Sequence, residues 1–130
     1  MLIINVDDDA DDREMFCEAL RAIDELISCV QHDSGQKALE FLRSHPETPD
    51  FIFVDINMPK MNGYECVYAI RSIDHLQHVP IVMFSTAFNP HLQHPEEKNV
   101  TFVAKSSRFN ELVESIKALI LVPSPPAERS

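Results

Sequence analysis

The sequence predicts an α/β fold in which helices cover both faces of a doubly wound parallel sheet of five strands. Three observations lead to this fold class. Short apolar segments alternate with segments of helical periodicity about five times along the chain. The strand segments are almost continuously apolar, which is typical of parallel strands that are buried on both faces. Several of these strands end abruptly in charged or polar residues.

The first half of the chain holds two pairs of a strand and a helix. Leu2–Val6 is an apolar run that stops at acidic residues, which indicates a buried strand. Residues 9–24 carry apolar side chains at three- and four-residue spacing behind a group of aspartates, which indicates a helix. We predict a second strand at residues 26–30 and a second helix with an apolar face over residues 38–42, before a loop with two prolines at residues 45–49.

The second half repeats the alternation. Phe51–Val54 gives the strongest strand signal and also stops at an acid. A loop with an Asn-Gly turn leads into a helix over residues 64–73. Two more apolar strands follow at residues 81–84 and 100–104, and the spacing of apolar residues over 112–120 predicts the last helix.

Two segments depart from this alternation. Residues 87–99, where a fourth helix is due, contain Pro90 and Pro95, so we expect at most a short or irregular helix there. Residues 123–130 are rich in proline and polar residues, and we expect them to form a flexible tail. The predicted domain therefore covers residues 1–122, with no output domain after it.

Charge and composition exclude several classes of function. The 130 residues include 11 Lys and Arg against 21 Asp and Glu, which gives a net charge of −10. Such a chain repels phosphate backbones and anionic lipid, so we expect no nucleic-acid or membrane partner. No apolar run approaches the ~20 residues that span a bilayer, and the N-terminus does not resemble a signal peptide.

The three cysteines are Cys17, Cys29 and Cys66, and none of them has a C-x-x-C partner. An odd number of cysteines in apolar or helical contexts argues against a disulfide framework. We expect buried, reduced thiols in a cytoplasmic protein.

Polar side chains gather where the predicted strands end. The carboxyl ends of parallel strands meet at one edge of a sheet, and ligands bind beyond that edge. Carboxylates that meet there repel one another unless a cation lies among them, and an all-oxygen ligand set suits Mg²⁺. A lysine and a hydroxyl at the same edge suit a bound anion, so the pattern predicts a phosphoryl-transfer site. The residues concerned are Asp7, Asp8, Asp9, Asp55, Ser85, Thr86 and Lys105.

These residues and their neighbours resemble the response-regulator receiver domains of two-component signalling. The resemblance covers roughly residues 1–121 and depends on several short motifs taken together, each at a strand end. It implies a flavodoxin-like, five-stranded sheet in the order 2-1-3-4-5 with five helices, which brings Asp7 and Asp8 next to Asp55. The motifs are Val6-Asp7-Asp8, Val54-Asp55-Ile56-Asn57-Met58-Pro59, Met61-Asn62-Gly63, Pro80-Ile81-Val82-Met83-Phe84-Ser85 and Lys105.

The resemblance implies a role for each acidic residue. Asp55 is expected to be the nucleophile and phosphoacceptor, which takes the phosphoryl group of a kinase phosphohistidine as an acyl phosphate. Asp8 is expected to bind Mg²⁺ directly, Asp7 mostly through water, and Asn57 through its backbone carbonyl, with Asp55 completing the metal site.

The resemblance also implies roles for the residues on later strands. Lys105 is expected to pair with Asp55 and then with the phosphoryl oxygens. Ser85, or Thr86 if the register differs by one residue, is expected to donate a hydrogen bond to the phosphoryl group. Pro59 and Gly63 are expected to shape the loop after Asp55.

Two positions depart from the family pattern. The family usually has proline after the lysine, often in a cis bond, whereas this chain has Ser106. A non-proline cis bond costs about 3 kcal/mol, so we expect a trans bond, a shifted loop and a less fixed lysine. Phe102 lies where the family commonly has a Tyr or Phe that swings as Ser85 is recruited, and it lacks a hydroxyl.

Other interpretations stay open at this stage. One alternative is a degenerate receiver that binds partners without phosphorylation, and another is a haloacid-dehalogenase-like phosphatase with Asp7 as nucleophile. A calcium loop is disfavoured because Asp12 stands where such loops need glycine. Two His-x-x-His pairs, at residues 75–78 and 91–94, are better explained as surface histidines than as a zinc site.

The sequence as a whole predicts a stand-alone receiver that catalyses its own Mg²⁺-dependent aspartyl phosphorylation and dephosphorylation. Its expected partner is a histidine kinase or a histidine phosphotransfer protein, and a downstream protein that the sequence does not identify would bind the switched form. We expect a cytoplasmic monomer or weak dimer.

Overall fold

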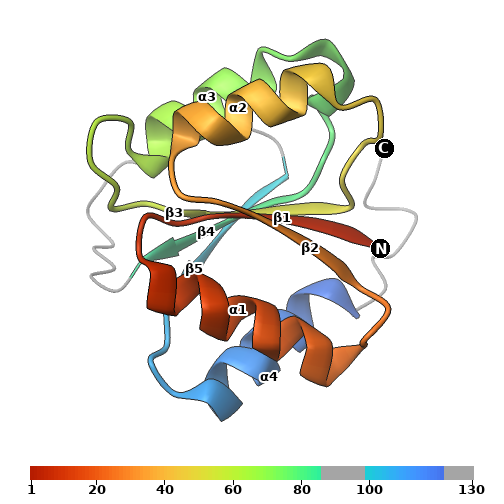
Figure 1. Ribbon diagram of the computed structural model, residues 1–130, viewed down its shortest axis with the longest axis vertical. Coiled ribbons are helices and arrows are strands. Elements are labelled where there is room, and N and C mark those ends of the chain that lie inside the picture. The colour runs from red at the N-terminus through yellow and green to blue at the C-terminus, as the bar shows by residue number, and fades with distance from the viewer. Residues whose placement is uncertain (86–98, 122–130) are drawn as a thin grey trace.

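The protein forms one parallel sheet with helices on both faces, and the computed structural model describes residues 1–85 and 99–121 (Figure 1). The strand order is β2-β1-β3-β4-β5, with every neighbouring pair parallel. The predicted fold class and strand order are therefore confirmed. The strands are β1 (Leu2–Val6), β2 (Ser28–His32), β3 (Phe51–Asp55), β4 (Ile81–Ser85) and β5 (Val100–Ala104).

The helices divide into two layers. In Figure 1, α1 (Ala10–Ile23) and α4 (Phe109–Ile120) lie on one face of the sheet, and α2 (Gly35–Ser44) and α3 (Gly63–Arg71) lie on the other. A short 3-10 helix, η1 (Asp74–Leu76), follows α3. No helix in the described ranges is long and apolar enough to cross a membrane.

Alternate residues of the central strands serve two separate apolar cores. Ile4 of β1 packs in the core beneath α2 and α3, whereas its neighbour Ile3 packs in the core beneath α1 and α4. Both side chains are fully buried, and so is Phe53 of β3. Each such side chain contributes about 1.5–3 kcal/mol of burial free energy, which explains why these strands are apolar at nearly every position.

The prediction for β2 was wrong by two residues at each end, since the strand runs over Ser28–His32 and not over residues 26–30. The strand begins at Ser28, whereas Leu26 is 81% exposed. The side chain of Asp24 accepts a hydrogen bond from the Leu26 amide at 2.9 Å, and the Asp24 carbonyl accepts one from the Ile27 amide. This local aspartate turn holds Leu26 outside the sheet although its side chain is apolar.

The expectation of three reduced cysteines was also wrong. Cys17 of α1 and Cys29 of β2 form a disulfide, with their Cα atoms 6.1 Å apart. Because α1 packs over β2, the topology brings together two cysteines that are 12 residues apart in sequence. Cys66 is a free thiol and is buried, and burial raises its pKa to about 12.

Two sequence predictions lie outside the described residues. The irregular helix expected at residues 87–99 falls there except for Asn99, and so does the tail expected at residues 123–130. Asn99 itself adopts a positive φ of 62° just before β5. Its carbonyl accepts hydrogen bonds from the Arg71 side chain at 3.3 Å and from the Ile81 amide at 3.0 Å, which anchors the start of β5 to α3 and β4.

Candidate functional site

The end of β1 delivers acidic side chains to one edge of the sheet. Asp7 extends the strand by one residue, since its amide donates to the His32 carbonyl of β2 at 3.1 Å. The side chain of Asp7 is buried and accepts a hydrogen bond from the Asp9 amide at 2.9 Å. Asp9 in turn caps α1 by accepting from the Asp12 amide, so the turn from strand to helix fixes Asp7 in place.

Asp55 lies beside Asp7 at the end of the neighbouring strand. It is the last residue of β3 and pairs with Phe84 of β4, and it is only 8% exposed. One of its carboxylate oxygens accepts a hydrogen bond from the Asn57 amide at 3.3 Å. The strand order therefore brings together the two acids that the sequence predicted to meet.

Three carboxylates of this edge could hold a cation. One oxygen each of Asp7, Asp8 and Asp55 lies within 4.8 Å of the others. Asp7 and Asp55 are buried, whereas Asp8 is exposed. Hard oxygen donors with one side open to water suit Mg²⁺, so the predicted metal ligands on these three residues fit the arrangement. The expected contribution of the Asn57 carbonyl stays a prediction.

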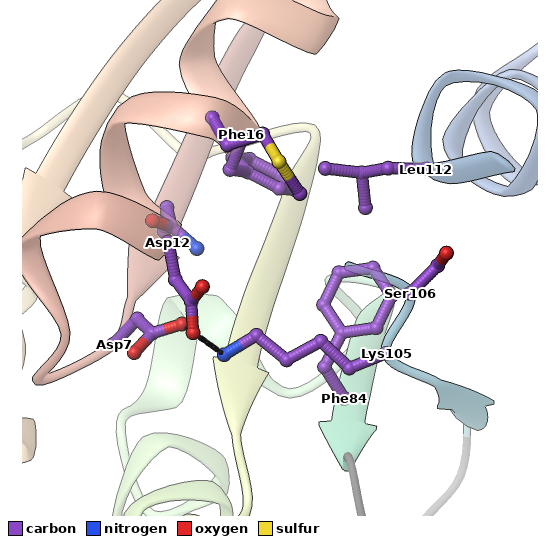
Figure 2. Close-up of a pocket in the computed structure, with 9 residues that line it drawn as sticks. Asp7, Asp12, Phe16, Phe84, Lys105, Ser106 and Leu112 are labelled. Atoms are coloured by element: carbon purple, nitrogen blue, oxygen red, sulfur yellow. Dashed lines mark hydrogen bonds and ion pairs between the residues drawn. The ribbon is translucent and has the colours of Figure 1, made fainter. Parts of the chain in front are cut away.

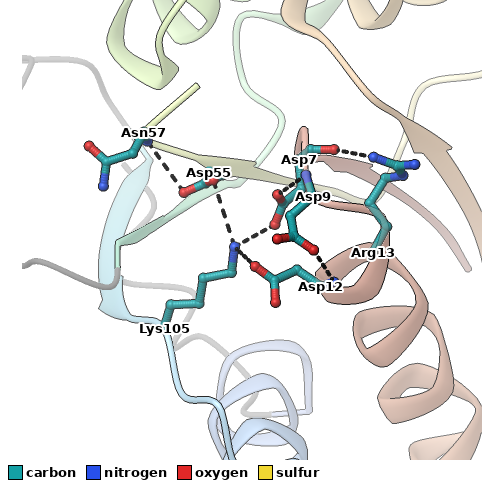
Figure 3. A network of polar contacts seen from close by, with 7 residues as sticks. All are labelled: Asp7, Asp9, Asp12, Arg13, Asp55, Asn57 and Lys105. Atoms are coloured by element: carbon teal, nitrogen blue, oxygen red, sulfur yellow. Dashed lines mark hydrogen bonds and ion pairs between the residues drawn. The ribbon is translucent and has the colours of Figure 1, made fainter. Parts of the chain in front are cut away.

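Lys105, the residue that follows β5, reaches into this acidic group (Figure 3). Its ammonium nitrogen lies 2.5 Å from Asp7 Oδ2, 2.8 Å from Asp12 Oδ2 and 3.7 Å from Asp55 Oδ2. The side chain of Lys105 is 11% exposed. The lysine is thus held tightly by ion pairs, and the expectation that it would be less fixed was wrong.

The electrostatics of the site reflect an excess of negative charge. Burial raises the pKa of Asp55 to about 6, and the charge of Asp7 adds to this effect while Lys105 opposes it. Burial would lower the pKa of Lys105, but its hydrogen bonds to Asp12 and Asp7 raise that pKa above the ordinary value. One ammonium group cannot neutralise three carboxylates, so a divalent cation would relieve the remaining repulsion.

The hydroxyl predicted on β4 lies at the same edge. Ser85 is the last residue of β4 and is 4% exposed. Its carbonyl accepts a hydrogen bond from the Lys105 amide at 2.8 Å. The ends of the adjacent strands β4 and β5 therefore hold Ser85 and Lys105 side by side. Thr86, the alternative hydroxyl, lies outside the described residues. Phe102 of β5 is half-buried, and its ring lies 6.3 Å from that of Tyr64 on α3.

The loop after Lys105 depends on Ser106 in place of the family's proline. No cis peptide bond occurs in the described parts of the chain, so the predicted trans bond before Ser106 is confirmed. The Ser106 hydroxyl accepts from the Arg108 amide at 3.1 Å and donates to a Glu111 carboxylate oxygen at 2.7 Å. These bonds connect the loop to the first turn of α4, so hydrogen bonds of Ser106 hold the loop where the family usually has a proline.

The sequence analysis missed Asp12 as part of this site. Asp12 lies in the first turn of α1, and its side chain faces Lys105 (Figure 2). Asp7, Asp12 and Lys105 line a small cavity of about 10 Å³, which has room for about one water molecule. Asn5 also lines this cavity, and its buried Oδ1 has no hydrogen-bond partner within the described residues. The sequence offers one partial signal, which is that Asp12 lies in the first turn of a helix that begins at Ala10, soon after Asp7. This signal alone does not determine which way the Asp12 side chain points.

Comparisons with known proteins agree with this geometry. The sequence profile of the response regulator receiver domain matches residues 3–117. The two-component response regulator ORR5 of rice, Oryza sativa subsp. japonica, is 34% identical over 84 residues, which are 65% of this chain and 60% of that protein. The chain spans between 10% and 60% of the length of the curated relatives compared.

Solved structures share the same fold. The phosphorylated cyanobacterial phytochrome response regulator RcpA superposes with a TM-score of 0.77 at 26% identity, covering 95% of this chain and 96% of that one. The Mn²⁺-bound form of the response regulator Rcp1 superposes with a TM-score of 0.73 at 24% identity, covering 95% and 98%. The profile match spans most of the chain, and the sheet order and the acidic edge agree with it, so this chain belongs to the response regulator receiver domain family.

Proposed function

We propose that this chain is a phosphoreceiver in which Asp55 accepts a phosphoryl group from a phosphohistidine. The observation that carries the proposal is the position of Asp55, a buried carboxylate beside Asp7 and Asp8 and facing Lys105. A carboxylate in this position can attack phosphorus. The neighbouring metal-binding cluster and the ammonium group of Lys105 can then neutralise the charge of the transferred group.

The transfer exchanges one bond of phosphorus for another. A carboxylate oxygen of Asp55 forms a bond to phosphorus while the bond from phosphorus to the imidazole nitrogen of the donor breaks, and that nitrogen keeps the electron pair. Lys105 neutralises negative charge on the phosphoryl oxygens, and the Ser85 hydroxyl donates a hydrogen bond to one of them. Dephosphorylation follows when water attacks phosphorus and Asp55 leaves as the carboxylate.

Asp7, Asp8 and Asp55, with the Asn57 carbonyl, would hold Mg²⁺. When it is bound, Mg²⁺ neutralises the carboxylates and the phosphoryl oxygens, which lets two anions approach each other. Asp8 is the exposed member of the set and the one without another charged partner in the described part of the site, which suits direct coordination.

The biological setting of the proposal follows from this chemistry. The donor is a histidine kinase or a histidine phosphotransfer protein, and a downstream protein docks on the phosphorylated form. We propose a monomer or weak dimer in the cytoplasm, although the Cys17–Cys29 disulfide removes the argument that reduced thiols made for this location. We expect no direct binding to nucleic acid, because the net charge of −10 opposes contact with phosphate backbones.

The test is transfer of label from a phosphorylated histidine kinase, or from acetyl phosphate, in the presence of Mg²⁺. We expect an acid-stable, base-labile label on the wild-type chain and none on Asp55→Asn, whereas Asp11→Asn, on the exposed side of α1, keeps the label. Label that survives Asp55→Asn would overturn the assignment. A wild-type chain that binds partners but takes no label and binds Mg²⁺ poorly would instead be a degenerate receiver.

A further inference from the structure

Lys105 has a carboxylate partner that belongs neither to the metal cluster nor to the phosphoacceptor. Asp12 Oδ2 lies 2.8 Å from the Lys105 ammonium nitrogen, within hydrogen-bond distance. The cluster of possible metal ligands in the described residues comprises Asp7, Asp8 and Asp55, and Asp12 is not among them. The contact of Asp12 with Lys105 therefore needs an explanation other than metal binding.

The start of α1 fixes Asp12 in this position. Asp9 caps the helix, and its side chain accepts a hydrogen bond from the Asp12 amide at 3.1 Å. The Asp12 side chain is 38% exposed, whereas that of Lys105 is 11% exposed. The ion pair thus lies at the mouth of the site, between the first turn of α1 and the loop that follows β5.

Asp12 and Asp55 approach the ammonium group of Lys105 from different sides (Figure 3). At 2.8 Å, the contact to Asp12 is a close ion pair, whereas the 3.7 Å to Asp55 is beyond hydrogen-bond distance. With Asp7 at 2.5 Å, the lysine gives its two close contacts to carboxylates that do not react. To pair with a phosphoryl group on Asp55, the same ammonium group would have to turn away from Asp12 and toward Asp55.

We propose that Asp12 is a positioning residue that holds Lys105 on the α1 side and thereby limits its engagement with the phosphoryl group on Asp55. The inference rests on the proposed phosphoreceiver function. Removing the Asp12 carboxylate frees one N–H of Lys105 and removes one negative charge beside an anion-binding position. Both effects favour the bound phosphoryl group.

The size of the effect follows from the exposure of the pair. A partly exposed ion pair changes an equilibrium by about threefold to fivefold. We expect Asp12→Asn to lower the half-saturating concentration of beryllofluoride, a stable phosphoryl mimic, by about that factor at saturating Mg²⁺. We expect the rate of acyl phosphate formation from acetyl phosphate to rise by a similar factor.

Asp11→Asn is the matched control. Asp11 is the preceding residue on α1, is exposed, and undergoes the same change of charge, but the described structure gives it no contact with Lys105. It measures the general effect of removing one negative charge near the site. Asp12→Glu, which restores the charge, should return both quantities toward the wild-type values, and Asp12→Ala, which removes the acceptor oxygens, should match or exceed Asp12→Asn.

The NMR signal of the Lys105 ammonium group gives a readout that a merely structural role would not move. We expect its ¹⁵Nζ resonance to shift in Asp12→Asn and not in Asp11→Asn, because Asp12, unlike Asp11, forms an ion pair with Lys105. If the wild-type chain is phosphorylated but Asp12→Asn behaves like Asp11→Asn in beryllofluoride binding, rate and resonance, the role of Asp12 is wrong. A wild-type chain that takes no phosphoryl group contradicts the proposed function instead, and the role of Asp12 with it.

Discussion

At the scale of single residues, the main feature is a buried acid that resists ionisation. Asp55 has a pKa of about 6, well above its ordinary value of 3.8, because it is buried beside Asp7. The protonated form therefore stabilises the metal-free protein below pH 4, and this contribution is lost as the pH rises through 6. The side chain that we propose as the phosphoacceptor therefore also lowers the stability of the metal-free protein at neutral pH.

This sign gives a prediction for Asp55→Asn in the absence of divalent metal. Asparagine imitates the protonated acid, so the variant should have a higher free energy of unfolding than the wild type, by about 3 kcal/mol at pH 7.5 and about half of that at pH 5. Urea unfolding in EDTA at the two pH values measures the difference. Asp11→Asn serves as control, and an advantage of Asp55→Asn that did not grow with pH would contradict the pKa.

The residues at the strand ends were the most predictable part of the site. Asp7, Asp55 and Lys105 could be placed together from sequence because the carboxyl ends of parallel strands converge at one edge. Asp12 could not, because its contact depends on the angle at which α1 leaves β1. The Cys17–Cys29 pair was missed for a similar reason, since it depends on how α1 packs over β2.

At the scale of elements, the loop after Asp55 depends on close packing at the first residue of α3. A Cβ atom on Gly63 would lie 2.6 Å from Ile56 Cα and 2.7 Å from the Asp55 carbonyl oxygen. Both contacts are with backbone, which cannot move without displacing the end of β3. Gly63 is therefore required for its lack of a side chain, a reason that the expected role of Gly63 in the loop did not include.

Gly35, the first residue of α2, offers a matched comparison. A Cβ atom there would meet Met61 Sδ at 2.6 Å, but this atom lies near the end of a flexible side chain that can move away. We expect Gly63→Ala to lower the free energy of unfolding by about 2–3 kcal/mol and Gly35→Ala by less than about 1 kcal/mol. Denaturant titration of both variants checks this, and equal losses would show that backbone contact is not what matters at Gly63.

The boundaries of the elements were predictable where apolar periodicity and local turns agreed. β5 lies at the predicted residues, and α1 lies within one residue of the prediction at each end. β2 differed because the Asp24 turn outweighed the apolar character of Leu26. A local hydrogen bond to the backbone can thus exclude an apolar residue from a strand, which periodicity alone does not reveal.

At the scale of the whole molecule, stability should depend on divalent metal. The chain carries a net charge of −10, and three of its carboxylates converge at one edge. A cation that binds the folded chain and not the unfolded chain stabilises it by mass action. The free energy of unfolding and the occupancy of the metal site are therefore coupled.

The corresponding prediction concerns thermal unfolding. Mg²⁺ at ten times its Kd should stabilise the protein by about 1.4 kcal/mol and raise the Tm by about 5 °C at pH 7.5. The shift should be smaller at pH 5, because a metal ligand must be deprotonated and Asp55 is then mostly protonated. Asp8→Asn should lose most of the shift and Asp11→Asn should keep it, whereas a full shift in Asp8→Asn would place the ion elsewhere.

The backbone hydrogen bond from the Lys105 amide to the Ser85 carbonyl constrains how the molecule can respond to a bound group. Adjacent strands keep a spacing of about 4.8 Å, so the main chains at these two positions cannot separate without breaking the ladder. Adjustment to a larger or smaller anion must then come from rotation about side-chain bonds. This edge of the sheet therefore accommodates different anions through the side chains of Ser85 and Lys105, while the main chains that carry them keep their positions.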